Sequence, residues 1–460
     1  MSRISRAVRI LAARPLSPPR ALALGYAGCI LVGTGLLALP FATASGESPR
    51  LMDALFTATS AVCVTGLIVV DTPSFWSPFG HGVILALIQV GGLGYMTVST
   101  FIALLVRRRV SLWERIVLHK AVGTLTVEGL MRFVWRILVI TAVVEGGATL
   151  ILTLRFASDR PIGEAFFLGL FHAVSAFNNA GFSLFSDSLA GFVGDPVINL
   201  TVVLCILVGG IGYFVINEFL EWRRRTGHAR LSVHTRLVLY VTGGLLSGSF
   251  VLFALLEWSN PSTLAGLGVT ERLLAAFFQV VTPRTAGFNT LPISSLQQAT
   301  LFILILLMFV GASPGGTGGG IKTTTFGTVL LALWRSLRGD RDVNVMGRRL
   351  PQRVLNDAFV LASLSFNFVV LVTLVLMVTE GTPYLVTLFE ATSAFGTVGL
   401  STGAPGLPTS FCSLFSDFGK IVIAGTMVAG RVGPVTLGAA LLSREPTPGY
   451  HLLEEQVLIG

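Results

Sequence analysis

Charged residues are scarce in this chain of 460 residues. Asp, Glu, Lys and Arg make up only 12% of the chain, whereas 53% of its residues are hydrophobic, and its mean hydropathy is +0.79. A soluble protein carries about twice that share of charge. The composition therefore excludes an ordinary soluble protein and predicts an all-α protein that crosses a membrane several times.

Cysteine patterns and nucleotide-binding motifs are also missing. The four cysteines form neither a CxxC pair nor a zinc spacing and lie in or near apolar segments, which indicates packing. A GxGxxG motif in a βαβ pattern is absent, so any dinucleotide would bind to another chain. Without an acid/base or nucleophile constellation, we expect no enzyme activity and no organic cofactor.

Long apolar runs dominate the chain. A membrane span needs roughly 20 mostly apolar residues. The first run is longer than the core of a usual signal peptide, so we expect a span there rather than a cleaved signal. Eight such runs occur, near residues 22–40, 80–106, 133–154, 197–220, 237–257, 298–312, 358–379 and 418–442.

The net charge of +9 follows from where the basic residues lie. Most of the 32 Lys and Arg residues fall in the two termini and in linkers near 107–136, 223–236 and 335–353. By the positive-inside rule, both termini are expected to be cytoplasmic, with the linkers near membrane lipids. This placement argues against nucleic-acid binding.

One short pattern occurs four times, with a phenylalanine ten residues before a glycine. An apolar span precedes each copy and another follows it, often with a glycine-rich marker such as Gly91-Gly92-Leu93-Gly94. Small residues in these markers allow close helix contact. The copies are Phe56 to Gly66, Phe171 to Gly181, Phe277 to Gly287 and Phe389 to Gly399.

The repeat predicts a fold. A helix of ten to twelve residues rises less than about 20 Å, so it must re-enter rather than cross the membrane. Non-helical backbone at membrane depth survives only inside protein or along a water-filled path. We expect four tandem helix–pore-loop–helix repeats with pseudo-fourfold symmetry around one pore. The expected units are a cytoplasmic N-terminus (1–20), repeat 1 (21–106), linker and repeat 2 (107–225), repeat 3 (226–336), linker and repeat 4 (337–443) and a C-terminal tail (444–460).

The four glycine segments suit a monovalent cation. Rings of backbone carbonyls can replace an ion's hydration shell, and glycine permits the backbone angles that this requires. The C-terminal ends of the half-helices direct partial negative charge at the axis. Only Glu390 is acidic in these segments, and it lies early in its half-helix. The pattern favours a cation such as K⁺ over Ca²⁺ or Mg²⁺, which prefer carboxylates or ordered water.

Residues 310–322 interrupt the second spanning helix of repeat 3 with six glycines and a proline. These residues are poor helix formers, so we expect a mobile intramembrane gate loop rather than an ordinary kink. Arg431 lies at membrane depth and is expected to restrict flow together with the loop, although a structural pairing stays an alternative. Lys322 suits gating or snorkelling equally well. A nucleotide P-loop does not fit, because Ile321 stands where glycine must precede the lysine.

The motifs TSAVCVTG (59–66), FNNAGFSLFSDSL (177–189), PRTAGFNTL (283–291), GASPGGTGGGIKT (311–323), SAFGTVGLSTG (393–403) and GRVGPVTL (430–437) resemble the Trk/Ktr/HKT superfamily of potassium transporters, most closely its bacterial Ktr membrane subunits. The resemblance covers nearly the whole chain and implies potassium uptake across the bacterial inner membrane through a regulated, channel-like pore. It implies a K⁺ filter formed by Val64, Thr65, Gly66, Asn179, Ala180, Gly181, Thr285, Ala286, Gly287, Thr397, Val398 and Gly399. It also implies a gate formed by Gly311, Ser313, Pro314, Gly315, Gly316, Thr317, Gly318, Gly319, Gly320, Lys322 and Arg431.

The same resemblance implies partners. Ktr membrane subunits form homodimers and bind a cytosolic ring of RCK domains that takes ATP or ADP. The tail at 444–460 resembles the Ktr tail, which packs at the dimer interface; a frayed terminus is the alternative. Sodium stimulation, and whether K⁺ flows passively or by symport, stay open. The competing readings are a Trk relative, a secondary transporter of an organic solute and a membrane enzyme.

Overall fold

The computed structural model describes residues 18–94, 127–224, 230–340 and 342–434, together with 436 and 438. The expected N-terminus up to residue 17, most of the first basic linker and the tail at 444–460 lie outside these residues, so the expectations for them stay open. Helices make up most of the described part. Its strands are a two-residue pair, β1 (Asn344–Val345) and β2 (Arg348–Arg349).

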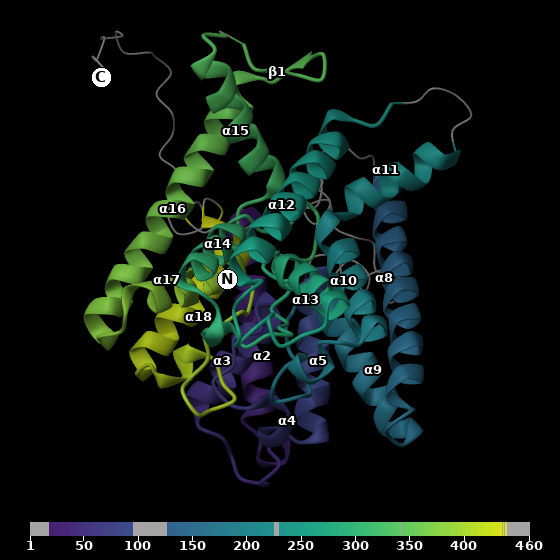
Figure 1. Cartoon of the computed structure of the whole chain (residues 1–460), viewed down its shortest axis with the longest axis vertical. Coiled ribbons are helices and arrows are strands. Elements are labelled where there is room, and N and C mark those ends of the chain that lie inside the picture. Colours follow the sequence, from purple (N-terminus) through teal and green to yellow (C-terminus); the bar gives the residue numbers. More distant parts are fainter. Residues whose placement is uncertain are drawn as a thin grey trace, which may run out of the picture.

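Four long helices open the four expected repeats (Figure 1). They contain the four segments of the described residues that are individually long and apolar enough to cross a membrane. Apolar side chains such as Leu31, Leu255 and Val378 are exposed on them, as expected for helices that face lipid. The helices are α2 (Pro18–Leu37), α8 (Val127–Phe156), α12 (Val233–Glu257) and α16 (Gln352–Glu380).

A shorter helix stands at each of the four places where the glycine pattern predicts a half-helix. The residues of these helices are mostly buried near their C-terminal ends, where each chain leaves the helix for its glycine segment. The half-helices are α3 (Leu51–Cys63), α9 (Ile162–Phe177), α13 (Val269–Val281) and α17 (Tyr384–Gly396).

The second helix of each repeat differs from the expectation of a continuous span. These helices have 12 to 16 residues, and three end at a glycine with positive φ: Gly94 (78°), Gly212 (94°) and Gly433 (91°). After Gly212 the chain bends by 92°. All four helices thus end inside apolar runs, whereas the sequence predicted an interruption only in repeat 3. The helices are α5 (Pro78–Leu93), α10 (Pro196–Ile211), α14 (Gln298–Phe309) and α18 (Asp417–Val432).

The remaining elements lie mainly toward the two ends of the molecule. The β1–β2 hairpin and part of α15 lie at one end, and α4 lies near the opposite end (Figure 1). These elements are α4 (Thr72–Phe75), α11 (Tyr213–Arg224), α15 (Thr323–Leu337) and the 3₁₀ turns η1 (Pro40–Ala42), η2 (Ala190–Phe192), η3 (Ile293–Ser295) and η4 (Phe411–Leu414).

Glycine brings the second helices against the half-helices. A Cβ atom at Gly91 would overlap the carbonyl oxygen of Val62, which is four residues before Gly66, the glycine of the first repeated pattern. Gly209 and Gly430 meet the carbonyl oxygens of Phe177 and Phe395, at the same place in repeats 2 and 4. The close contact predicted from the glycine markers is thus present in three repeats.

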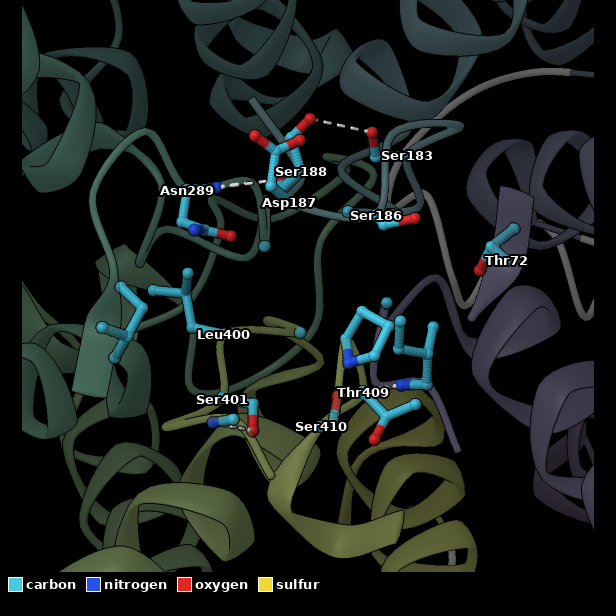
Figure 2. A pocket seen from close by; sticks show the side chains of 18 of the residues that line it. Thr72, Ser183, Ser186, Asp187, Ser188, Asn289, Leu400, Ser401, Thr409 and Ser410 are labelled. Atoms are coloured by element: carbon cyan, nitrogen blue, oxygen red, sulfur yellow. Dashed lines mark hydrogen bonds between the residues drawn. The ribbon is translucent and has the colours of Figure 1, made fainter. Parts of the chain in front are cut away.

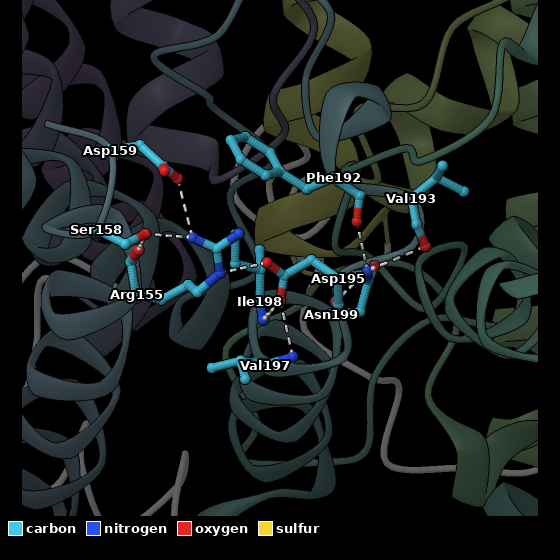
Figure 3. A network of polar contacts seen from close by, with 9 residues as sticks. All are labelled: Arg155, Ser158, Asp159, Phe192, Val193, Asp195, Val197, Ile198 and Asn199. Carbon is cyan, nitrogen blue, oxygen red and sulfur yellow. Dashed lines mark hydrogen bonds and ion pairs between the residues drawn. The ribbon is translucent and has the colours of Figure 1, made fainter. Parts of the chain in front are cut away.

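A polar network joins the end of α8 to the start of α10 (Figure 3). Arg155 contacts Asp195 at 2.5 Å and Asp159 at 3.0 Å. The hydrogen bond from Arg155 holds the pKa of Asp159 below its ordinary value. Asp195 also caps α10 by accepting hydrogen bonds from the backbone N–H groups of Val197 and Ile198. The network fixes the first and second helices of repeat 2 relative to each other.

Candidate functional site

The four glycine segments form a closed ring. A Cβ atom on Gly66 would overlap the segment of Gly181, and one on Gly181 would crowd the segment of Gly287. A Cβ atom on Gly287 would likewise overlap the segment of Gly399, and one on Gly399 would overlap the segment of Gly66. Segments more than a hundred residues apart in sequence are therefore neighbours, and side chains larger than hydrogen do not fit between them.

Each segment has the same unusual backbone. Its first and third residues have positive φ, and its second does not. Alternation of this kind turns successive peptide groups toward one side, unlike an ordinary strand. Non-glycine residues rarely adopt positive φ, so four instances at matching positions indicate a conformation imposed by the surroundings. The pairs are Val64 (57°) and Gly66 (91°), Asn179 (59°) and Gly181 (70°), Thr285 (70°) and Gly287 (81°), and Thr397 (49°) and Gly399 (91°).

A hydroxyl side chain from each half-helix holds the adjacent segment. In repeats 1 and 4 the serine hydroxyl accepts a hydrogen bond from the N–H of the ring glycine; in repeats 2 and 3 the hydroxyl donates to the carbonyl that follows. Sequence reasoning missed these residues, although a Ser or Thr five or six positions before each glycine was a readable signal. They are Ser60, Ser175, Thr282 and Ser393.

One side of the ring opens into a cavity of about 290 Å³, which we call the cavity side. The four ring glycines line it. Figure 2 shows side chains around it from loops of all four repeats, such as Thr72, Ser183, Asn289 and Ser401. Its lining is rich in hydroxyl groups and includes the amide of Asn289 and the carboxylates of Asp71 and Asp187, without Lys or Arg. Such a surface attracts cations and can exchange hydrogen bonds with a hydrated ion.

Matching side chains support two walls of this cavity. His172 and Glu390 both lie nine residues before their ring glycines. The His172 Nε2 atom lies 3.0 Å from the hydroxyl of Ser183, and Ser401 donates a 2.5 Å hydrogen bond to Glu390. Each serine lies two residues after its ring glycine. His172 itself is buried.

The opposite side of the ring, which we call the loop side, is filled by residues 310–322. The Gly319 N–H donates a 3.0 Å hydrogen bond to the Thr397 hydroxyl, and Gly318 lies against the Thr285 hydroxyl. The Thr317 N–H donates to the Gly209 carbonyl at 3.0 Å. The predicted gate residues Gly311, Ser313, Pro314, Gly315, Gly316, Thr317, Gly318, Gly319 and Gly320 therefore form one loop next to the first residues of the ring segments.

Two cations are attached to this loop. Arg431 on α18 donates hydrogen bonds to the carbonyl oxygens of Thr317 in the loop and of Gly91 at the end of α5. Lys322, the residue before α15, donates a 2.7 Å hydrogen bond to the Gly318 carbonyl. The structure thus brings both cations predicted for the gate onto the loop, and it gives Arg431 backbone partners in two repeats.

The ring contains all twelve residues that the resemblance assigned to a filter. Ala180, Thr285 and Val398 are among them and are fully buried. Among the described residues, no group of three or more His, Cys, Asp or Glu side chains could hold a metal ion. The ligands that the ring can offer a cation are therefore backbone carbonyls and the hydroxyl and amide groups beside them.

Comparison with known proteins gives a consistent result. Residues 30–445 match the family model described as TrkH, cation transport protein. The chain is 40% identical to the Ktr system potassium uptake protein B of Bacillus subtilis over 423 residues, which are 91% of this chain and 92% of that protein.

Two further relatives cover almost the full chain, and a solved structure shares the fold. The Ktr system potassium uptake protein B of Vibrio alginolyticus is 38% identical over 96% of this chain and 95% of its own. The potassium/sodium uptake protein NtpJ of Enterococcus hirae is 36% identical over 97% and 98%. The crystal structure of the potassium transporter TrkH from Vibrio parahaemolyticus matches with a TM-score of 0.70 at 20% identity, covering 91% of this chain and 84% of that one.

Proposed function

The chain belongs to the TrkH cation transport protein family, and from this premise we propose that it takes up potassium ions through the ring of its four glycine segments. The closed ring with matching backbone angles is the observation that carries the proposal. It brings twelve uncharged residues, three from each segment, to one place beside the cavity. Such a site replaces water around a weakly hydrated ion without the strong field of carboxylates.

The twelve ring residues are proposed as the potassium filter. Glycine at the third position lets neighbouring segments approach each other. The hydroxyls of Ser60 and Ser393 accept hydrogen bonds from the N–H groups of two of these glycines and so hold their segments. The names of three relatives support potassium as the ion, and the name of one adds sodium. We therefore propose K⁺ as the main substrate and leave sodium as an outcome of the experiment.

The proposed gate is the loop of residues 310–322, which ends at Lys322, together with Arg431. The loop lies against Thr285 and Thr397, the first residues of two ring segments. A positive charge at membrane depth raises the barrier to a cation, and Arg431 is joined directly to the loop. The loop must move, or its charges must withdraw, before an ion can pass.

The molecular setting is proposed from charge and from the relatives. The end that carries α11, α15 and the β1–β2 hairpin holds basic residues and is proposed to face the cytoplasm of a bacterial inner membrane. The relatives' names refer to a system, which supports a second, regulatory component. We propose an RCK-domain ring that binds ATP or ADP for that component, and a homodimer for the membrane part.

Flux of ⁸⁶Rb⁺ into liposomes that contain the purified chain tests the function. We expect uptake that unlabelled K⁺ inhibits and that amino acids and sugars do not. The assay is run with and without Na⁺, and liposomes without protein are the control. The proposal would be contradicted if the protein took up amino acids or sugars. It would also be contradicted if folded protein took up no Rb⁺, whether K⁺ was inside or outside the liposomes.

A further inference from the structure

A carboxylate lies near the middle of a membrane-spanning helix. Glu145 belongs to α8, and the apolar segment of that helix runs from Arg132 to Phe156. In the four long helices of the described residues, other acidic side chains lie close to helix ends. An acidic group at membrane depth is costly and is retained where it serves a function. The transport path proposed above does not use Glu145.

Glu145 belongs to a small hydrogen-bonded network outside the ring. The Asn178 side-chain N–H donates to Glu145 at 2.9 Å and to Gln89 at 3.0 Å. Gln89 in turn donates to the second oxygen of Glu145 at 3.3 Å. Among the described residues, no Lys or Arg forms an ion pair with Glu145. Two amides therefore satisfy the carboxyl group in place of a cation.

Three elements from two repeats meet in this network. Gln89 comes from α5, Glu145 from α8 and Asn178 from the end of α9. Asn178 is fully buried, and a Cβ atom at Gly92 would overlap its side-chain oxygen. The second glycine of the first repeat's marker thus makes room for Asn178. The side chain of Asn178 is held tightly at one place.

Asn178 directly precedes the ring. The next residue, Asn179, has positive φ and is the first residue of the second ring segment. Its side chain donates a 3.3 Å hydrogen bond to the hydroxyl of Thr285 in the neighbouring segment. A displacement of Asn178 is therefore passed to Asn179 and to the contact between two segments.

We infer that Glu145 is a positioning residue that sets the discrimination between K⁺ and Na⁺ by holding the second ring segment through Asn178. The inference rests on the proposed function. A carbonyl ring prefers the larger ion only while its oxygens keep their places, and support from outside the ring maintains them. The corresponding residues of the other repeats are Cys63, Arg284 and Gly396, so only repeat 2 has an amide for a carboxylate to hold.

The test compares Glu145→Leu with Glu145→Gln in the ⁸⁶Rb⁺ assay, with unlabelled K⁺ or Na⁺ as competitor. Leucine removes the acceptor for Asn178. For each competitor we measure the concentration that halves uptake, and we divide the value for Na⁺ by the value for K⁺. We expect this ratio to fall about fivefold, the factor that corresponds to one hydrogen bond. Glutamine keeps an acceptor oxygen, so its ratio should stay within about twofold of the unmodified protein. Leu150→Ala, at a lipid-exposed position of α8, is the matched control.

Each outcome decides the inference. A folded Glu145→Leu protein with unchanged selectivity would overturn it, as would an equal loss in Glu145→Gln, which would assign the effect to charge. If Glu145→Leu does not fold, Gln89→Leu removes one acceptor and should shift the ratio in the same direction by a smaller factor; an unchanged ratio there would overturn the inference. If the unmodified protein shows no Rb⁺ uptake, the proposed function itself has failed.

Discussion

The two sides of the ring contrast in space and in charge. The cavity side holds about 290 Å³ of open volume and two carboxylates, whereas the loop side is filled by residues 310–322 and carries Lys322 and Arg431. One side is suited to collecting cations and the other to stopping them. In the proposed function, the filter and the gate are therefore neighbours that meet at Thr285 and Thr397.

The two sides also differ in how they are held. Side chains brace the cavity side, with His172 bonded to Ser183 and Glu390 bonded to Ser401. Hydrogen bonds with backbone groups dominate the loop side, where Arg431 reaches the Thr317 carbonyl. Glycine gives a loop little preference for one conformation. We therefore expect the loop side to move and the cavity side to keep its shape.

A substitution in the ring, which separates the two sides, should have the largest effect on ion flux. In Gly399→Ala, the new Cβ atom overlaps the Thr65 carbonyl oxygen, and the residue keeps a φ of 91°, which is strained for alanine. We expect ⁸⁶Rb⁺ flux to fall by about tenfold or more. Gly425→Ala is the control, because a Cβ atom there meets nothing within 4 Å. Equal flux in both folded variants would show that the ring is not the path.

Removing the charge from the loop side should have the next largest effect. Arg431→Ala loses the hydrogen bonds to Thr317 and Gly91 together with the positive charge, so the barrier to a cation falls. We expect Rb⁺ flux without any regulatory partner to rise by about fivefold. Arg335→Ala removes a half-buried cation that pairs with Asp340 away from the ring, and it should leave flux unchanged. Unchanged flux in folded Arg431→Ala would mean that this arginine stabilises the structure and does not limit ion flow.

A smaller change weakens the contact between ring and loop. Thr397→Val keeps the shape of the side chain but loses the acceptor for the Gly319 N–H, a bond worth about 1 kcal/mol. The loop should leave the ring more often, and flux should rise by about twofold to fivefold. Thr379→Val, whose hydroxyl bonds only within α16, is the control. A decrease in flux would indicate that the Thr397 hydroxyl contacts the ion instead.

The ring could be anticipated from sequence because its signal is local and repeated. Phenylalanine and glycine at fixed spacing recur in four copies, and the half-helices stand where that pattern predicts them. The helix ends at Gly94, Gly212 and Gly433 were not anticipated. A glycine inside an apolar run costs only about 1 kcal/mol in a helix, so hydropathy alone continues the span across it.

The networks around the ring were harder to anticipate. The bond from Asn178 to Gln89 spans 89 positions in the chain and joins two repeats, so no local pattern announces it. Glu145 was visible as a carboxylate within an apolar run, but its partners depend on how α5, α8 and α9 pack. The hydroxyls such as Ser60 were different, because their spacing from the glycines repeats and could have been read directly.

The smallest expected effect comes from the charge on the cavity side. Asp187→Asn removes an exposed carboxylate from the cavity lining while keeping an oxygen that can accept from the Gly191 N–H. Cations should then be less concentrated at the ring, and Rb⁺ flux should fall by about twofold at roughly 10 mM salt but not at 150 mM, where screening shortens the reach of a charge to about 8 Å. Asp159→Asn, in the loop between α8 and α9 and outside the cavity lining, is the matched control. A salt-independent loss in Asp187→Asn would mean that this residue shapes the loop rather than attracts ions, and the contrast between the two sides would then rest on Lys322 and Arg431 alone.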